Sequence, residues 1–379
     1  MNLDNKYKTA SIALIVVMAI GVLSWLVTLV TTPKWGIMVT NFIYFVGISE
    51  SAIFIVVMLR TANAKWAKPL FRLGGLITYS FIPMAAAMFV VVLLGQGAFF
   101  YWIGGEGSSN PWLNPLFFTV RELLFFVLFY YFAYRIFKIS MNNDDIEESG
   151  VDRSLLLRNV PLLIIFVVHQ SIIGWDMAMT LYPHFLSTVF TIRFWVTNVY
   201  GGFAAMILIM AALKRYFGVK TIEAVHFFNL GNLLLAFSVF WIYFTWADFF
   251  PFWYANLPEE TPVLYGVMFS KEFSSIHTLR LALGAIPFVI LTFSKVRRNT
   301  SVLQVLAVVI LIGIWIERYL MVIPPLISEE KMSYSPMIGI TNILLSVGLL
   351  GGFILSLIFA ANRYESIITR EPKPELDHH

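Results

Sequence analysis

Ten long apolar segments constrain this chain more than any other feature of its sequence. Each has about 20 residues with few charges, the length that an α-helix needs to cross the roughly 30 Å hydrocarbon core of a bilayer. The segments are continuously apolar, whereas the strands of a membrane barrel alternate apolar and polar residues. We therefore predict an all-α integral membrane protein with about ten transmembrane helices. Their approximate ranges are 10–32, 36–60, 74–99, 114–137, 159–179, 185–212, 225–248, 276–295, 302–323 and 337–360.

Little of the sequence remains to form a domain in water. Hydrophobic residues make up 59% and charged residues 13% of the 379 residues, whereas a soluble domain carries about 25% charged residues. Lys6 and Lys8 precede the first apolar segment, as in a signal peptide. That segment is too long for one and no small-residue cleavage site closes it, so we expect a retained helix. Residues 1–379 are then a single membrane domain.

Lysine and arginine gather in alternate connections between the predicted helices. The basic segments lie at residues 60–72, 135–158, 214–220, 295–298 and 363–373. Cytoplasmic loops of membrane proteins carry such an excess of positive charge. Both termini are therefore predicted to be cytoplasmic, in a bacterial-type inner membrane. The sequence pI near 9.1 reflects this topology and does not indicate a nucleic-acid partner.

The content of cysteine and histidine limits the redox cofactors. The chain has no cysteine, which excludes thiolate-bound iron–sulfur clusters. A b-type haem needs two histidines at one depth on facing helices. His169 lies well inside a predicted span, whereas His184, His226 and His277 lie near span ends. We expect neither haem nor an iron–sulfur cluster in this chain, so a redox function would use a diffusible organic carrier or a partner's cofactor.

Ionisable residues inside the spans are the candidate functional residues, because a charge in hydrocarbon is costly and usually serves a function. Glu50 lies deep in the second span with no cation on its own helix. Either it is protonated or a neighbouring helix supplies a cation or a donor. Its two interpretations are a proton or quinone role and a structural hydrogen bond. The other candidates are Arg121, Glu122, His169, Asp176, Arg193, Asp248, Arg280, Glu317 and Arg318.

Two pairs of opposite charge are adjacent in the sequence, Arg121-Glu122 and Glu317-Arg318. Adjacent helical residues do not face each other. We therefore expect each member to pair across helices, and part of their role is to hold the helices in register.

Other polar residues fall at helical spacing. His169 and Asp176 lie on one face of the fifth predicted helix, about 10 Å apart, which suits a water-linked proton relay; a solvated Asp176 at the helix end is the alternative. His226 begins a polar stripe on the seventh helix and Asp248 closes its outer end. Such a stripe serves either proton movement or hydrogen bonding between helices.

Several blocks of the sequence resemble the NrfD-like family of membrane subunits, known from polysulfide reductase and alternative complex III. The similarity covers roughly residues 34–265, and is in particular to the second quinone-type subunit of alternative complex III. The matching blocks are Lys34-Trp35-Gly36, Asn41 to Ser49, Pro111 to Arg121, Trp175 to Thr188, His226 to Asn232, and Trp253 to Thr261. Quinone-binding relatives tend to carry histidine where this chain has Glu50.

The resemblance implies two four-helix bundles with flanking helices. It further implies quinol oxidation near the outer face and an iron–sulfur subunit docked there, within a complex of further membrane and cytochrome subunits. The quinone-binding candidates are Glu50, Asn41, Tyr44, Arg121 and Glu122. The candidates for a proton pathway are His169, Asp176, Arg193, His226, Asp248, Glu317 and Arg318.

We therefore expect a membrane subunit of a respiratory oxidoreductase complex. It would interact with menaquinone or ubiquinone, pass electrons between the quinone pool and a partner iron–sulfur subunit, and take part in proton translocation. Two alternatives stay open. A secondary transporter also has buried charges and broken-helix signals such as Ile82-Pro83, and an anchor subunit would carry a degenerate quinone site.

Overall fold

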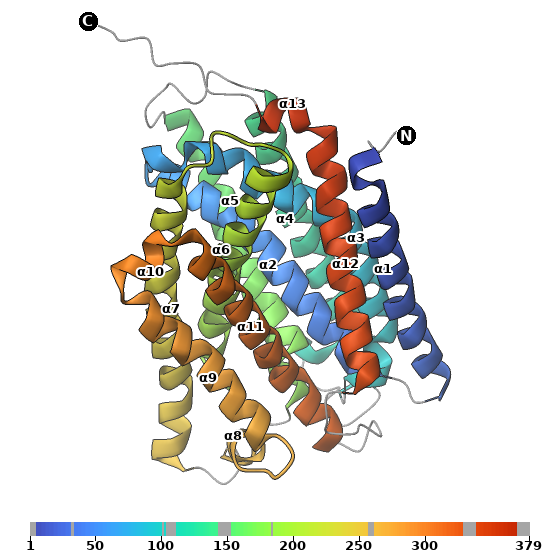
Figure 1. Ribbon diagram of the computed structural model, residues 1–379. Coiled ribbons are helices and arrows are strands. Elements are labelled where there is room, and N and C mark those ends of the chain that lie inside the picture. The colour runs from blue at the N-terminus through green and yellow to red at the C-terminus, as the bar shows by residue number, and fades with distance from the viewer. Residues whose placement is uncertain are drawn as a thin grey trace, which may run out of the picture.

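The computed structural model describes residues 5–31, 34–100, 102–103, 111–142, 153–182, 185–256, 261–328 and 339–369. Ten of the helices in these segments are long and apolar enough to cross a membrane, which confirms the predicted all-α membrane fold (Figure 1). They are α1 (Asn5–Thr31), α2 (Trp35–Thr61), α3 (Lys68–Phe99), α4 (Pro115–Asn142), α5 (Arg153–Met177), α6 (Phe190–Tyr216), α7 (Ala224–Ala255), α9 (Ser274–Leu291), α11 (Thr300–Ser328) and α12 (Ile340–Arg363). Three shorter α-helices are α8 (Thr261–Met268), α10 (Ser294–Arg298) and α13 (Glu365–Ile368).

Eight of the long helices form two bundles. In the first bundle α2, α3, α4 and α5 contact one another in a closed ring, and in the second bundle α6, α7, α9 and α11 do the same. The bundles meet where α2 contacts α6 and α11, and where α5 contacts α6. The remaining pair, α1 and α12, lies side by side at the edge of the molecule and packs on α3 (Figure 1).

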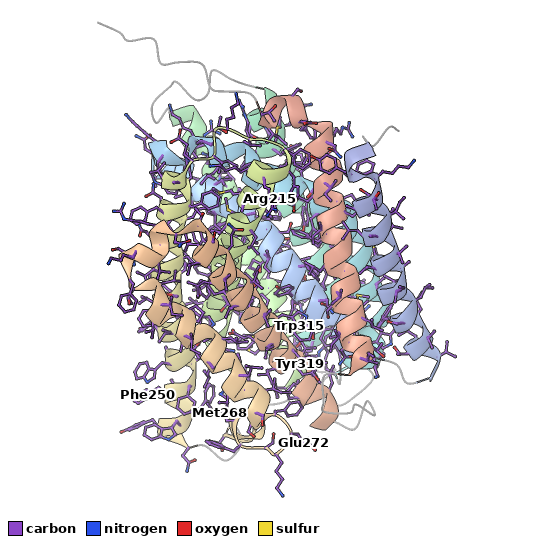
Figure 2. The ribbon with its side chains drawn as sticks, viewed as in Figure 1. Arg215, Phe250, Met268, Glu272, Trp315 and Tyr319 are labelled. Atoms are coloured by element: carbon purple, nitrogen blue, oxygen red, sulfur yellow. The ribbon has the colours of Figure 1, made fainter. Side chains whose placement is uncertain are left out.

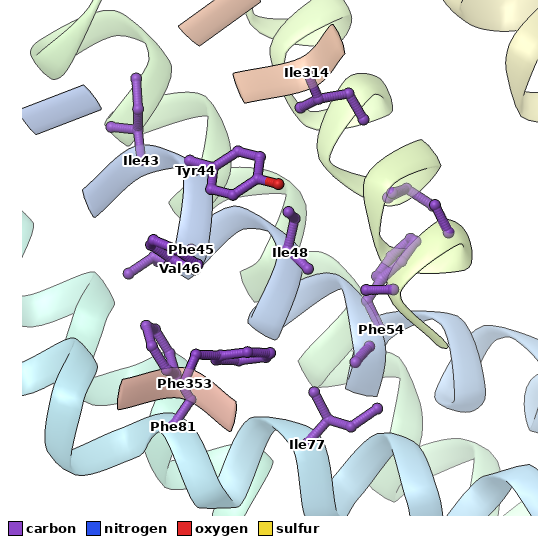
Figure 3. Close-up of a cluster of buried hydrophobic side chains, with 14 of the residues drawn as sticks. Ile43, Tyr44, Phe45, Val46, Ile48, Phe54, Ile77, Phe81, Ile314 and Phe353 are labelled. Carbon is purple, nitrogen blue, oxygen red and sulfur yellow. The ribbon is translucent and has the colours of Figure 1, made fainter. Parts of the chain in front are cut away.

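Helix α2 is the central element of the structure. Its residues from Gly36 to Val57 are buried, because helices of both bundles surround it. Its aromatic side chains pack in turn: the Phe45 ring contacts Phe81 of α3 and Phe353 of α12, as Figure 3 shows. Glu50 is thereby held away from lipid.

Helices α1 and α12 approach closely through glycines. A Cβ on Gly21 would lie 2.8 Å from the Cα of Gly348 and 2.4 Å from the backbone oxygen of Leu344. Small residues let membrane helices approach in this way, since lipid and side chains are equally apolar and contact at short range stabilises the pair. This contact fixes the flanking pair.

The two ends of the molecule are distinguished by the helices that lie there. The start of α1 lies at the same end as α13, and α8 lies at the opposite end (Figure 1). We call these the α13 end and the α8 end. Arg215 lies toward the α13 end, whereas Phe250 and Glu272 lie at the α8 end (Figure 2).

Some helix boundaries differ from the predicted ones. The predicted span 276–295 ends at Leu291, because Arg297 folds back and its guanidinium donates to the carbonyl oxygens of Leu291 and Thr292. The predicted span 185–212 begins at Phe190, and Ser187 before it bonds Asp248 instead. The connection expected after residue 248 is helical to Ala255 and contains α8.

Alanine at Gly348 should loosen the contact between α1 and α12. Its Cβ would lie 2.9 Å from the Cα of Gly21 and 3.2 Å from the backbone oxygen of Val17, so the helices must separate. We expect Gly348→Ala to lower the thermal unfolding midpoint of the detergent-purified protein by several degrees. Gly97→Ala is the matched control, since a Cβ there meets nothing within 4 Å. Equal midpoints for the two variants would contradict this packing.

Candidate functional site

Buried charges of the first bundle gather around Arg121 on α4. Its Nη2 donates to Oδ1 of Asp176 on α5 at 2.8 Å, and its Nε lies 2.5 Å from Oδ2. The indole Nε1 of Trp112 donates to the same carboxylate at 2.9 Å, and the guanidinium lies 4.1 Å from the Trp112 ring centroid. Planar two-point pairing with additional donors is the geometry in which a buried ion pair is tolerated. The expected cross-helix pairing of Arg121 is therefore observed.

Glu122 lies beside this ion pair. Its carboxyl group is fully buried and interacts with that of Asp176. Among the described residues, neither of its oxygens has a hydrogen bond of ordinary geometry. Two acidic groups thus share a single arginine at this point.

Glu50 forms a second buried group in the middle of the first bundle. Its Oε2 accepts a hydrogen bond of 2.7 Å from Nε2 of Gln170, and Nδ1 of His169 lies 3.2 Å from the same oxygen. All three side chains are fully buried. Within the described residues, Oε1 of Glu50 and Nε2 of His169 have no hydrogen-bond partner. A neighbouring helix, α5, thus supplies a donor to Glu50, the amide of Gln170, which is one of the two possibilities that the sequence left open.

The second bundle holds two ion pairs. Arg193 on α6 contacts Asp248 on α7, with Nη1 2.9 Å from Oδ2. Arg280 on α9 contacts Glu317 on α11, with Nη1 3.2 Å from Oε2, and the indole Nε1 of Trp241 donates to the same oxygen at 2.8 Å. These pairs join all four helices of the second bundle.

Trp241 can reach Glu317 because α9 carries a glycine, Gly284, opposite the indole ring. A Cβ at Gly284 would lie 2.1 Å from the indole. Glycine at this position therefore admits the ring that donates to Glu317. Close approach of α7 and α9 at this level leaves space further toward the α8 end.

A cavity of about 350 Å³ occupies that space between α7 and α9, and it is open rather than enclosed. Trp246 and Leu281 line it and are also exposed on the outer surface of the two helices, so the cavity opens sideways where a bilayer would cover the protein. Its polar lining residues are Arg193, Thr245, Asp248, His277 and Arg280, and its apolar ones are Trp241, Ile242, Trp246, Phe249, Met268, Leu281 and Ala285.

A smaller cavity of about 90 Å³ adjoins the first and shares its charged residues. It extends to Glu317 and to Tyr182 near the α8 end. Burial raises the pKa of the Tyr182 phenol above its ordinary value, so that the group stays neutral and can donate. Met268 of α8 borders both cavities at the α8 end (Figure 2).

Four polar atoms of residues that line the larger cavity have no hydrogen-bond partner within the part of the chain that the structure describes. They are Nε of Arg193, Oγ1 of Thr245, Nε2 of His277 and Nε of Arg280. Buried polar groups are normally hydrogen-bonded, so each such atom requires an explanation. A ligand with oxygen acceptors and donors would satisfy them.

The structure separates some residues that the sequence grouped together. Asn41 and Tyr44 lie on α2 with Glu50, but both face α11: Oδ1 of Asn41 accepts from Trp315, and the Tyr44 hydroxyl donates to the carbonyl oxygen of Leu311. Trp315 is marked in Figure 2. Glu50 lines neither of the two cavities. Asn41 and Tyr44 therefore contact a different neighbouring helix from Glu50, which contacts α5.

His226 lies near the other end of α7, away from the second-bundle ion pairs. Its Nδ1 accepts from the backbone N–H of Glu223 and completes a reciprocal cap of the helix. This contact favours a structural role for His226. Another histidine, His184, lies outside the described residues.

Neutral residues of the site carried no clear signal in the sequence. Gln170, Asn198, Trp241 and Trp112 bind the buried charges, yet a lone amide or indole in an apolar segment is common. His277 lay near a span end and was considered only as a haem ligand. Only the position of the neutral polar residues inside a span indicates a role for them, because a polar side chain at mid-span must find a partner on another helix.

Comparison with known proteins adds no family assignment. No family model matches the chain, and no curated protein shows significant sequence similarity to it.

Removing one partner of the Arg121–Asp176 pair should destabilise the fold strongly. Breaking a buried ion pair leaves an uncompensated charge and costs about 3–5 kcal/mol. We expect Arg121→Met to reduce the free energy of unfolding by this amount, measured by denaturant unfolding in detergent. Arg121→Met/Asp176→Leu should recover part of the loss. The control is Arg135→Met on the same helix, where the arginine is exposed; an equal effect of the two single variants would refute the role of the pair.

Proposed function

We propose that this chain is the quinone-interacting membrane subunit of a respiratory oxidoreductase complex, in a bacterial-type cytoplasmic membrane. The observation that carries the proposal is the sideways-open cavity between α7 and α9, with four unpartnered polar atoms in its wall. The resemblance to NrfD-like subunits supports the same function. It implies an iron–sulfur subunit on the outer face, together with further membrane and cytochrome subunits.

The cavity fits the chemistry of a quinone. A quinone has a small ring with two oxygens and a long apolar tail that stays in the bilayer. Pockets for small molecules have volumes of about 300–1,000 Å³ and combine an apolar lining with a few directed polar groups. Arg280 and His277 offer donors to the ring oxygens, while Trp246 and Leu281 border the opening through which the tail would remain in lipid.

Residues at the polar wall can also hold and move protons. His277 lines the cavity and its Nε2 has no hydrogen-bond partner among the described residues, so it is the candidate general acid or base toward a bound ring oxygen. Asp248 and Glu317 are the carboxylates that flank it. Because each is paired with an arginine, they stabilise the polar end of the cavity electrostatically. Electrons would leave through the partner's iron–sulfur cluster.

We propose that the α13 end is cytoplasmic and the α8 end faces outward. Basic side chains such as Arg215 and Lys214 occur in the last turn of α6, and an excess of these residues marks cytoplasmic connections. The cavity then lies in the outer half of the membrane. A partner subunit docked on the outer face would be near it.

His277→Leu tests the proposal. It removes one unpartnered donor with little change in volume and leaves both ion pairs in place. We expect binding of a short-tail menaquinone analogue, followed by quenching of tryptophan fluorescence, to weaken roughly tenfold, as for the loss of one hydrogen bond. Quinol oxidation by the assembled complex should fall in parallel.

Thr278→Val is the matched control for this experiment. Thr278 is the next residue on α9, it is exposed, and its hydroxyl donates to the backbone oxygen of Ser274. Unchanged binding in both variants would contradict a quinone site between α7 and α9. Solute uptake by proteoliposomes of the purified chain alone would favour the secondary transporter instead.

A further inference from the structure

Four buried side chains form a continuous hydrogen-bonded chain between the two bundles. Nη2 of Arg318 on α11 donates to Oδ1 of Asn198 on α6 at 2.9 Å. Nδ2 of Asn198 donates to Oε1 of Gln170 on α5 at 2.6 Å, and Nε2 of Gln170 donates to Oε2 of Glu50 on α2 at 2.7 Å. The relative exposure of all four residues is 0%. A cation in one bundle is thereby connected to an acid in the other.

The direction of this chain follows from its chemistry. A guanidinium has donors only, so Asn198 must present its oxygen to Arg318 and its NH₂ to Gln170. Gln170 must in turn present its oxygen to Asn198 and its NH₂ to Glu50. Every amide dipole therefore points the same way, and Glu50 receives a donor. This arrangement stabilises the ionised carboxylate.

The hydrogen-bonded chain also connects a bundle with more acids than arginines to a bundle with more arginines than acids. Among the described residues, the first bundle has three buried acids, Glu50, Glu122 and Asp176, and one buried arginine, Arg121. The described part of the second bundle has three arginines at the ion pairs or the chain, Arg193, Arg280 and Arg318, and two acids, Asp248 and Glu317. Among the described residues Arg318 forms no salt bridge; it donates to Asn198, to the backbone oxygen of Phe194 and to the sulfur of Met321. The excess cation is the one bound to the amides.

The backbone around the chain provides space for it. A Cβ on Gly47 of α2 would lie 2.4 Å from Cγ and 2.5 Å from Nδ2 of Asn198. Only glycine at this position lets the Asn198 amide lie between α2 and α6. The carbonyl oxygen of Phe194 and its ring, 4.1 Å from the guanidinium carbon, hold Arg318 from the other side.

We infer that Gln170 and Asn198 are positioning residues that couple the charge of Glu50 in the first bundle to Arg318, next to Glu317, in the second. Side-chain amides transmit polarisation but have no labile proton to pass on at neutral pH. The hydrogen-bonded chain therefore couples the two bundles electrostatically, but it does not conduct protons between them. Glu317 is also the partner of Arg280 at the cavity, so a change of charge at Glu50 alters the field at the quinone site. The significance of that last step rests on the proposed function, whereas the coupling itself does not.

Infrared spectroscopy of the purified chain tests the coupling without quinone or partner subunits. A buried protonated carboxyl group gives a resolved C=O stretching band, and the band of Glu50 is identified by its loss in Glu50→Gln. In Asn198→Leu the link is broken while Arg318 keeps its charge. We expect the amplitude of the Glu50 band to increase, because Gln170 loses the Asn198 donor that holds its NH₂ group toward Glu50.

Gly47→Ala provides a second break, because its Cβ displaces the Asn198 amide without removing any polar group. It should change the Glu50 band in the same direction as Asn198→Leu, and it carries the test if that variant does not fold. Gly201→Ala is the matched control at the same contact of α2 and α6. Its Cβ meets only the side-chain ends of Ile314 and Ile48, so the band should keep its wild-type amplitude.

The outcomes separate the inference from the proposed function. An unchanged Glu50 band in a folded Asn198→Leu or Gly47→Ala variant would overturn the coupling, whatever the quinone measurements show. An equal change in Gly201→Ala would also overturn it, because the effect would then come from packing. A change limited to the two breaking variants supports the coupling even where quinone fails to bind.

Discussion

The cost of a charge in an apolar interior governs how this protein is built. In bulk water Arg121 and Asp176 would gain little from pairing, but between α4 and α5 neither tolerates the loss of the other. The same condition holds for Arg193 with Asp248 and for Arg280 with Glu317. Each pair joins two different helices, so the requirement to neutralise charge also fixes which helices are neighbours. Apolar packing around α2 then fills the space between them.

The two bundles satisfy that requirement differently. The first is closed around Glu50 and His169, where the structure leaves polar atoms unpartnered among the described residues but neither cavity reaches them. In the second, α7 and α9 separate toward the α8 end, and the ion pairs border an open cavity. By their helix contacts alone the two bundles have the same arrangement, a closed ring of four helices. The two bundles differ in where their helices leave space.

Hydropathy was sufficient to predict the ten helices, because a span of about 20 apolar residues has few other uses. It also identified the buried charges, including Glu50 and Arg121. Partners were not predictable, because they depend on helix rotation and contact: Asn41 and Tyr44 share α2 with Glu50 but face α11. Gln170 and Asn198 were missed because a neutral amide has no charge that must be compensated. The quinone role and the family resemblance stay predictions.

The central claim is that a quinone ring binds between α7 and α9 rather than at Glu50. Photo-crosslinking with a ring-azido quinone analogue, followed by mass analysis of the labelled peptides, tests this most directly. We predict labelling within residues 241–249 of α7 and 277–285 of α9, suppressed by excess unlabelled quinone. Labelling confined to α2 and α5 around Glu50, or labelling that excess quinone does not suppress, would contradict the account.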